Sequence, residues 1–146
     1  MTFEYSVEIG PCSRNKVFVK NGRIINSHSV DRYRIWTGCG DICLCADRKR
    51  RVSGLSGSVD KLTHYKNEPL GCVEAMDGVI KIDCGIKLPE GVYICPPLVP
   101  VVYDDASSVL VFGDMRGDIC VKTAENVIVA LSGGRLCGVE ICNLKL

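Results

Sequence analysis

The stretch Lys16-Val-Phe-Val-Lys-Asn21-Gly22-Arg-Ile-Ile25 decides the fold class of this chain. An Asn-Gly pair between two apolar runs is a strong signal of a two-residue β-hairpin, because both residues of that turn need positive φ. The flanking Val, Phe and Ile residues also favour strands. The stretch therefore predicts two antiparallel strands joined by a tight turn.

Similar signals recur along the chain. A glycine turn at Ser132-Gly133-Gly134 lies within the apolar segment 126–141, and Asp77-Gly78 lies within the segment 72–83. Each predicts a further hairpin. Helical spacing occurs only at Ser58–Lys66, where apolar residues lie three apart. The other runs that predict strands are Thr2–Ile9, Tyr33–Thr37, Ile42–Ala46, Val92–Cys95, Val101–Tyr103, Val109–Phe112 and Ile119–Lys122.

Composition points the same way. The 146 residues contain 18 Val and 12 Ile but only 5 Ala, a balance that favours sheet over helix. With 47% hydrophobic and 24% charged residues, the chain has the usual makeup of a globular protein. We therefore predict an all-β fold with little helix, either a hairpin-built antiparallel sandwich or a partly open barrel. The proline-rich segment 95–100 separates a β-rich part, 1–95, from a hairpin part, 101–146, unless both form a single compact domain.

Ten cysteines leave three states open. Free cysteine is among the most buried residue types, so buried thiols are the first. Intracellular disulfides, as in heat-adapted proteins, are the second, and the absence of Gln fits a thermophilic chain. Metal binding is the third, with zinc at Cys39, Cys43 and Cys45 as the candidate, although their spacing does not repeat the usual Cys-x2-Cys pair. Cys43 and Cys45 share one strand face and are better placed to bond to a neighbouring strand than to each other.

The apolar segments predict a cytoplasmic protein without a membrane span. Residues 1–8 lack a basic segment and carry Glu4 and Glu8, which argues against a secretory signal. The longest apolar run, 91–103, contains three prolines and is too short to cross a bilayer.

The formal net charge of +1 hides a strong asymmetry along the chain. Residues 11–66 hold twelve Lys or Arg and four Asp or Glu, whereas residues 67–146 hold six and eleven. Arginines beside an indole on one strand face suit phosphate neutralisation and base stacking. They also suit a solvated strand face with a charged loop that protects a sheet edge. The candidate nucleic-acid-binding residues are Arg32, Arg34, Trp36, Arg48, Lys49, Arg50 and Arg51.

The last third of the chain carries motifs of a known family. They are Tyr103-Asp104, Val109–Phe112, Asn126–Leu131 and, above all, Gly134-Arg-Leu-Cys-Gly-Val-Glu-Ile-Cys-Asn143. With these motifs, residues 101–146 resemble domain-of-unknown-function family 2283, small prokaryotic proteins that close on Gly-x-hydrophobic-x-Gly-Ile-Glu-Ile. The resemblance implies a β-hairpin fold and no catalytic residue, because members of that family have no assigned activity. In this chain Ser132-Gly133 replaces the family's acidic turn, and Cys137 and Cys142 are additions.

The sequence contains no catalytic motif that we recognise. Gly54-Leu-Ser56-Gly57 is not the Gly-x-Ser-x-Gly elbow of the hydrolases. Our first hypothesis is a non-enzymatic interaction or structural module, with an acidic partner and homo-oligomerisation left open. The second is a nucleic-acid-binding protein that uses residues 32–51, and the third is a cysteine-based metal or redox protein.

Overall fold

The structure is a computed structural model that describes residues 3–28, 31–36, 42–58, 74–83, 89–94, 101–104 and 109–142. These residues form thirteen strands and contain no helix, so the all-β prediction is confirmed. Of the helix candidate, Ser58 ends a strand and residues 59–66 lie outside the described residues. The strands are β1 (Tyr5–Ile9), β2 (Val17–Lys20), β3 (Arg23–Asn26), β4 (Tyr33–Trp36), β5 (Ile42–Ala46), β6 (Val52–Ser58), β7 (Ala75–Ile82), β8 (Gly91–Ile94), β9 (Val101–Asp104), β10 (Val109–Gly113), β11 (Ile119–Ala124), β12 (Val127–Ser132) and β13 (Arg135–Ile141).

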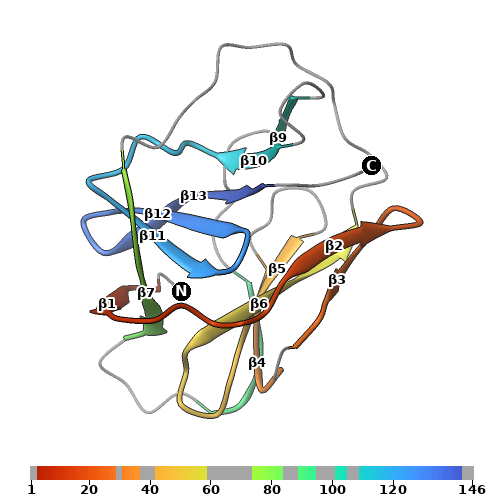
Figure 1. Cartoon of the computed structure of the whole chain (residues 1–146). Helices are drawn as coiled ribbons and strands as arrows, with labels where there is room; N and C mark the ends of the chain where they lie inside the picture. Colours follow the sequence, from red (N-terminus) through yellow and green to blue (C-terminus); the bar gives the residue numbers. More distant parts are fainter. Residues whose placement is uncertain are drawn as a thin grey trace.

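The strands make two sheets that pack against each other (Figure 1). The seven-stranded sheet has the order β1-β7-β11-β12-β13-β10-β9, and the six-stranded sheet has the order β2-β3-β6-β5-β4-β8. Most neighbours are antiparallel as predicted, but the pairs β7–β11 and β4–β8 are parallel. Neither sheet closes on itself among the described strands. The architecture is therefore a sandwich of two mixed sheets and not a barrel.

Two of the three predicted hairpins form with the expected turns. Asn21 and Gly22 have φ of 51° and 73° and join β2 to β3, with Lys20 paired to Arg23. Gly133 and Gly134 have φ of 58° and 78° and join β12 to β13. Two successive residues with positive φ match the right-handed twist of the strands, which is why these sequences turn here.

The predicted hairpin at Asp77-Gly78 is wrong, because β7 runs straight through this pair. On one side Gly78 pairs with Ile9 of β1, and on the other side β7 pairs with β11. A Cβ at Gly78 would lie 2.7 Å from the carbonyl oxygen of Glu8 and 3.1 Å from Val121 Cγ1. Glycine at this position thus allows two strands to approach closely, a known use of glycine inside strands.

Strand β6 was not predicted from the sequence. Its sequence, Val-Ser-Gly-Leu-Ser-Gly-Ser, is rich in small and polar residues and carries no clear alternation. Nevertheless β6 lies between β3 and β5 and places Val52 and Leu55 in the core. Pairing with two neighbours, and not intrinsic preference, makes this segment a strand.

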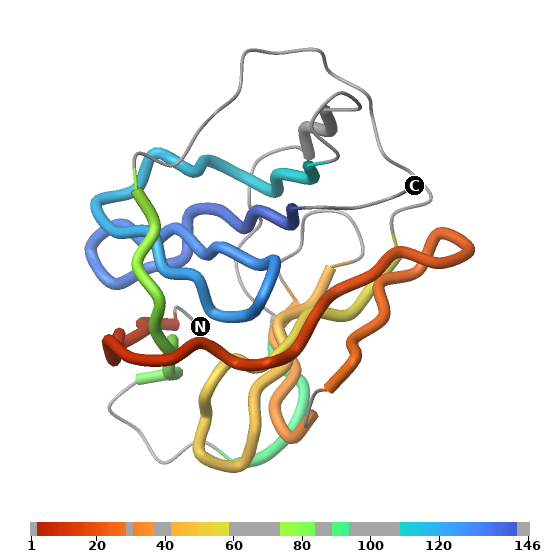
Figure 2. Tube along the Cα trace, in the orientation of Figure 1, coloured from red at the N-terminus to blue at the C-terminus, as the bar shows by residue number. Residues whose placement is uncertain are grey.

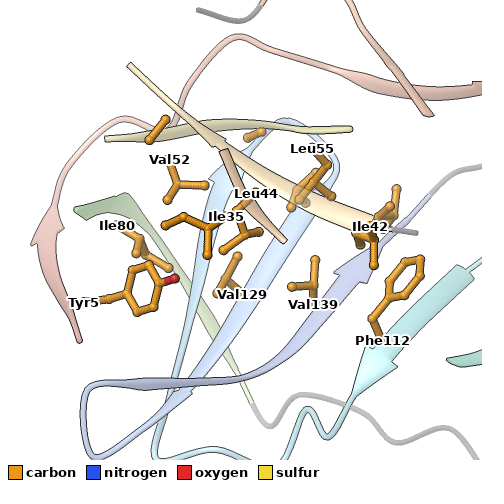
Figure 3. Close-up of a cluster of buried hydrophobic side chains, with 14 of the residues drawn as sticks. Tyr5, Ile35, Ile42, Leu44, Val52, Leu55, Ile80, Phe112, Val129 and Val139 are labelled. Atoms are coloured by element: carbon orange, nitrogen blue, oxygen red, sulfur yellow. The ribbon is translucent and has the colours of Figure 1, made fainter. Parts of the chain in front are cut away.

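The core lies between the two sheets (Figure 3). Ile35, Leu44 and Leu55 come from the six-stranded sheet, and Val129 and Val139 come from the seven-stranded sheet, each at most 1% exposed. The seven-stranded sheet combines β1 and β7 with strands of the last third of the chain, so described strands from both predicted parts share one sheet and one core.

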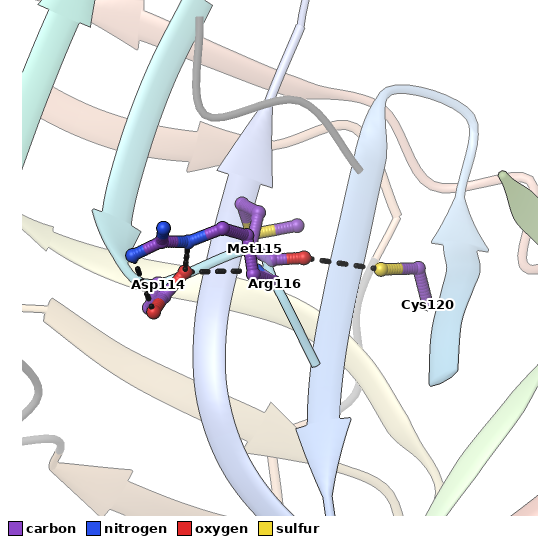
Figure 4. A network of polar contacts seen from close by, with 4 residues as sticks. All are labelled: Asp114, Met115, Arg116 and Cys120. Atoms are coloured by element: carbon purple, nitrogen blue, oxygen red, sulfur yellow. Dashed lines mark hydrogen bonds and ion pairs between the residues drawn. The ribbon is translucent and has the colours of Figure 1, made fainter. Parts of the chain in front are cut away.

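A second, smaller apolar cluster lies apart from this core and contains Met115 and Cys120. The turn that carries Met115 is held by Asp114, whose Oδ1 accepts hydrogen bonds from the backbone N–H and Nε of Arg116 at 2.8 and 3.1 Å (Figure 4). The Cys120 Sγ lies 3.5 Å from the carbonyl oxygen of Met115. The turn therefore covers this cluster with a buried methionine, 1% exposed.

Two buried asparagines tie β2 into the molecule. Asn126 accepts a hydrogen bond from the Val17 N–H at 2.8 Å and donates to the carbonyl oxygens of Val17, at 2.8 Å, and Cys142, at 3.0 Å. Asn15, fully buried, donates to the Ser53 carbonyl oxygen and accepts from the His28 N–H, both at 2.9 Å. These side chains form hydrogen bonds with backbone N–H and carbonyl groups that have no partner in the strand pairing. The bonds of Asn126 to Val17 connect one sheet to the other.

Candidate functional site

The charge asymmetry of the sequence becomes a difference between the two sheets. In the described residues, the segments of the six-stranded sheet carry ten Lys or Arg and three Asp or Glu, a balance of +7. The segments of the seven-stranded sheet carry four Lys or Arg and ten Asp or Glu, a balance of −6. Figure 2 shows the two groups of segments, largely orange to yellow and largely blue, on different sides of the molecule. The first group is 11–28, 31–36, 42–58 and 89–94, and the second is 3–10, 74–83, 101–104 and 109–142.

Strand β4 presents part of the predicted site. Tyr33 and Ile35 are buried in the core, so Arg34 and Trp36 lie on the opposite face of the sheet, as the alternation predicted. The Arg34 guanidinium donates a hydrogen bond to Asp31 and forms an ion pair with it, which raises the pKa of Arg34. Arg34 is exposed and Trp36 is half-buried.

The other predicted cations gather at one end of the same sheet, in the turn between β5 and β6. Asp47 organises this turn: Oδ1 accepts from the Lys49 and Arg51 N–H groups at 2.9 and 3.0 Å, and Oδ2 accepts from Arg51 Nε at 3.0 Å. Arg50 has a φ of 65° in the turn. Arg32 lies next to it, since its N–H donates to the carbonyl oxygen of Ala46 at 2.9 Å.

The β2–β3 hairpin adds a part of the basic surface that the sequence analysis did not assign. Phe18 and Ile25 pair across the hairpin and are 44% and 42% exposed. Lys16 Nζ lies 5.5 Å from the centre of the Phe18 ring, and Lys20 pairs with Arg23 at the turn. Residues 11–30 contain no Asp or Glu, and this was the signal in the sequence that could have assigned the hairpin to the basic surface.

Ion pairing separates the cations into two groups. Arg34 and Arg51 pair with Asp31 and Asp47, and Arg48 lies 3.9 Å from Glu90. Within the part of the chain that the structure describes, no ion pair involves Lys20, Arg23, Arg32 or Lys49. The side chains of these four residues can therefore bind an external anion without breaking an ion pair inside the protein.

The predicted cysteine site is only partly described, because Cys39 lies outside the described residues. Cys43 and Cys45 are buried on β5, on the face that carries Arg34 and Trp36. Their cross-strand neighbours are Trp36 and Ser56 for Cys43, and Arg34 and Gly54 for Cys45. The alternative of a disulfide to a neighbouring strand therefore does not hold for these two, since both are free thiols and no cysteine lies opposite either one.

Cys43 and Cys45 interact as a pair of thiols. A hydrogen bond from the Cys45 thiol lowers the pKa of Cys43, against the effect of burial, and Arg34 acts in the same direction as that bond. The same hydrogen bond, together with burial, raises the pKa of Cys45. Cys45 therefore keeps its proton while Cys43 is the more acidic thiol.

Among the described residues, five cysteines are free thiols; Cys43 and Cys45 are buried, as the first hypothesis has it, and the other three are half-buried. No group of three or more His, Cys, Asp or Glu side chains within the described residues is placed to hold a metal ion. The five free cysteines are Cys12, Cys43, Cys45, Cys137 and Cys142.

Cys142 provides a test of how burial controls these thiols. Burial and the nearby Glu140 carboxylate raise its pKa to about 11. At pH 8 we expect iodoacetamide to modify Cys142 roughly 100-fold more slowly than an ordinary thiol, because only thiolate reacts. Peptide mass spectrometry of the modified protein measures this rate. Labelling at the rate of a free thiol at pH 8 would contradict the assignment.

One variant separates the two causes of the raised Cys142 pKa. Glu140→Gln removes the carboxylate but not the burial, so it should accelerate labelling only in part. In the folded protein the thiol keeps its proton to a higher pH than in the unfolded chain. Between about pH 8.5 and pH 11 this thiol therefore makes stability fall as the pH rises.

No protein-family model matches the chain, and no curated protein or solved structure shows significant similarity to it. The resemblance of residues 101–146 to domain-of-unknown-function family 2283 therefore stays a prediction. Among the described residues, no helix has the length and apolar character needed to cross a membrane.

Proposed function

We propose that this protein is a non-enzymatic binding module that binds nucleic acid through its six-stranded sheet. The observation that carries the proposal is the separation of charge, +7 on the segments of one sheet and −6 on those of the other. A polyanion is attracted to the first sheet and repelled by the second, so the charge distribution orients it before any contact forms.

Two areas of the sheet supply phosphate contacts. The hairpin offers Lys20 and Arg23, and the end of the sheet offers Arg32 and Lys49, all without a described ion-pair partner. Each phosphate that a cation neutralises releases condensed counterions, so binding through these areas must weaken as salt rises.

Aromatic side chains favour single strands over duplexes. Phe18 is exposed on the hairpin, and Trp36 is half-buried beside Arg34. Unstacked bases of a single strand can stack on such rings, whereas bases inside a duplex cannot reach them. We therefore propose single-stranded nucleic acid as the preferred ligand.

The test measures binding of a fluorescein-labelled single-stranded oligonucleotide by anisotropy over a series of salt concentrations. We expect Lys20→Glu/Arg23→Glu to weaken binding by at least about tenfold at low salt and to reduce the salt slope by about 1.4, since each phosphate contact contributes about 0.7 on a single strand. The matched control is Lys122→Glu/Arg135→Glu, which reverses two charges on the acidic sheet. This control should leave binding essentially unchanged.

Trp36 is the single tryptophan of the chain and serves as an internal reporter. A single strand that stacks on the ring should quench its fluorescence, and Phe18→Ala should weaken binding of the single strand more than of a duplex. Equal effects of the two charge-reversed pairs, or equal binding of poly-glutamate and oligonucleotide, would overturn the proposal. The second outcome would instead indicate an acidic protein partner.

A further inference from the structure

A pocket of about 280 Å³ lies where the two sheets meet, away from the hairpin. Cys12 and Ser13 line it from the connection between β1 and β2, and Asp47 and Arg51 line it from the turn between β5 and β6. Val79 of β7 and Thr123 of β11 complete the side that the seven-stranded sheet provides. The pocket volume is close to the lower limit for small-molecule sites.

Arg51 is the cationic group of this pocket, and Asp47 holds it in place. The Asp47 carboxylate accepts from Arg51 Nε and from the Arg51 N–H, both at 3.0 Å. Among the described residues the two terminal nitrogens of Arg51 have no partner. A guanidinium bound at Nε presents those two nitrogens as a fork, which matches the two oxygens of a carboxylate.

The surroundings of the fork favour an anion. The Asp47 carboxylate already accepts from three donors, one of them the Arg51 guanidinium, and the backbone of Lys81 on β7 forms an isolated bridge with that of Arg51. Ser13 Oγ accepts from the Asn15 N–H at 3.1 Å, which leaves its O–H group to donate. The apolar wall, Val79, suits the hydrocarbon part of a ligand.

We propose that this pocket binds a small organic carboxylate, with the terminal nitrogens of Arg51 as the receptor for its two oxygens. The volume limits the ligand to about one ring or one short chain. The pocket shares the β5–β6 turn with Lys49 of the proposed nucleic-acid surface, but its receptor is Arg51 and its test does not depend on that function.

The half-buried Cys12 thiol in the pocket wall reports occupancy. The probe is benzoate, and benzamide is the uncharged control of nearly equal shape. We expect benzoate to bind with a Kd of about a millimolar. At about ten times that concentration, benzoate should slow the modification of the Cys12 thiol by neutral 4,4′-dithiodipyridine by roughly an order of magnitude. Mass spectrometry of the Cys12 peptide gives the rate. Benzamide should not protect Cys12.

Variants then test the role of Arg51. Arg51→Met should abolish the protection, whereas Arg48→Met, a change in the same turn but outside the pocket lining, should retain it. Arg51→Lys keeps the charge without the fork, and should give weak protection in a folded protein. Equal protection by benzoate and benzamide, no protection of the wild-type protein, or full protection in Arg51→Lys would overturn the proposal.

Discussion

We expect Asn126→Ala to lower the free energy of unfolding by about 3–5 kcal/mol, a large fraction of the total for a domain of this size. The change removes three hydrogen bonds and leaves the N–H and carbonyl groups of Val17 and the carbonyl group of Cys142 without a partner. Val17 is 1% exposed, so water cannot replace the lost bonds without opening the sandwich. Urea unfolding followed by circular dichroism measures the effect.

Asn126→Asp is the informative companion variant. Its carboxylate still accepts from the Val17 N–H but no longer donates to the two carbonyl oxygens, so a large loss should remain. Ser132→Ala, at an exposed position at the far end of β12, should change stability by less than about 0.5 kcal/mol. A loss below about 1 kcal/mol in Asn126→Ala would show that this asparagine does not hold β2 against the seven-stranded sheet.

The second large effect is expected at Gly138, which pairs with Gly113 where β13 passes the end of β10. A Cβ at Gly138 would lie 2.4 Å from the carbonyl oxygen of Asp114 and 2.9 Å from Met115 Sδ. Because the first of these neighbours is backbone, it cannot move aside by a change of rotamer. Gly138→Ala should therefore cost about 2–4 kcal/mol, measured as a shift of the urea midpoint at constant slope.

Gly133→Ala separates crowding from backbone strain. Gly133 has a φ of 58° and nothing within 4 Å of the position that a Cβ would take. Alanine at this position should therefore lower the free energy of unfolding only through the strain of the left-handed backbone conformation, by about 1–2 kcal/mol. If Gly138→Ala cost no more than Gly133→Ala, the close passage of β13 under the Asp114 turn would be refuted.

The basic hairpin and the acidic sheet are coupled through the same asparagine. Asn126, in the turn just before β12, binds Val17, the first residue of β2. The Lys16 ammonium and the Phe18 ring flank this anchored residue. Weakening the anchor should therefore disturb the proposed nucleic-acid surface as well as stability, which is why the charge-reversed variants, and not Asn126→Ala, test the function.

Much of the local structure could be predicted from the sequence. The turns at Asn21-Gly22 and Gly133-Gly134 formed because their residues tolerate positive φ better than others do. Arg34 and Trp36 lie on the face opposite Tyr33 and Ile35, because side chains alternate along any strand. These features depend on residues that are neighbours in the chain.

Other features had no local signal. Asp77-Gly78 has turn chemistry, yet β7 continues through it because β1 and β11 flank the strand. Strand β6 has a weak pattern, yet it is central in its sheet. The neighbours of Cys43 and Cys45, and hence their free thiols, follow from the registers of β4 and β6 with β5.

The sequence by itself determined the all-β class, two tight hairpins, the alternation on β4 and the basic character of residues 11–66. Only the tertiary structure decided that this charge lies on one sheet, that the hairpin belongs to it, and that a pocket forms at Arg51. The reason is the range of the interactions. Turn geometry and alternation act over a few residues, whereas the bonds that join β2 to the other sheet link positions 109 residues apart.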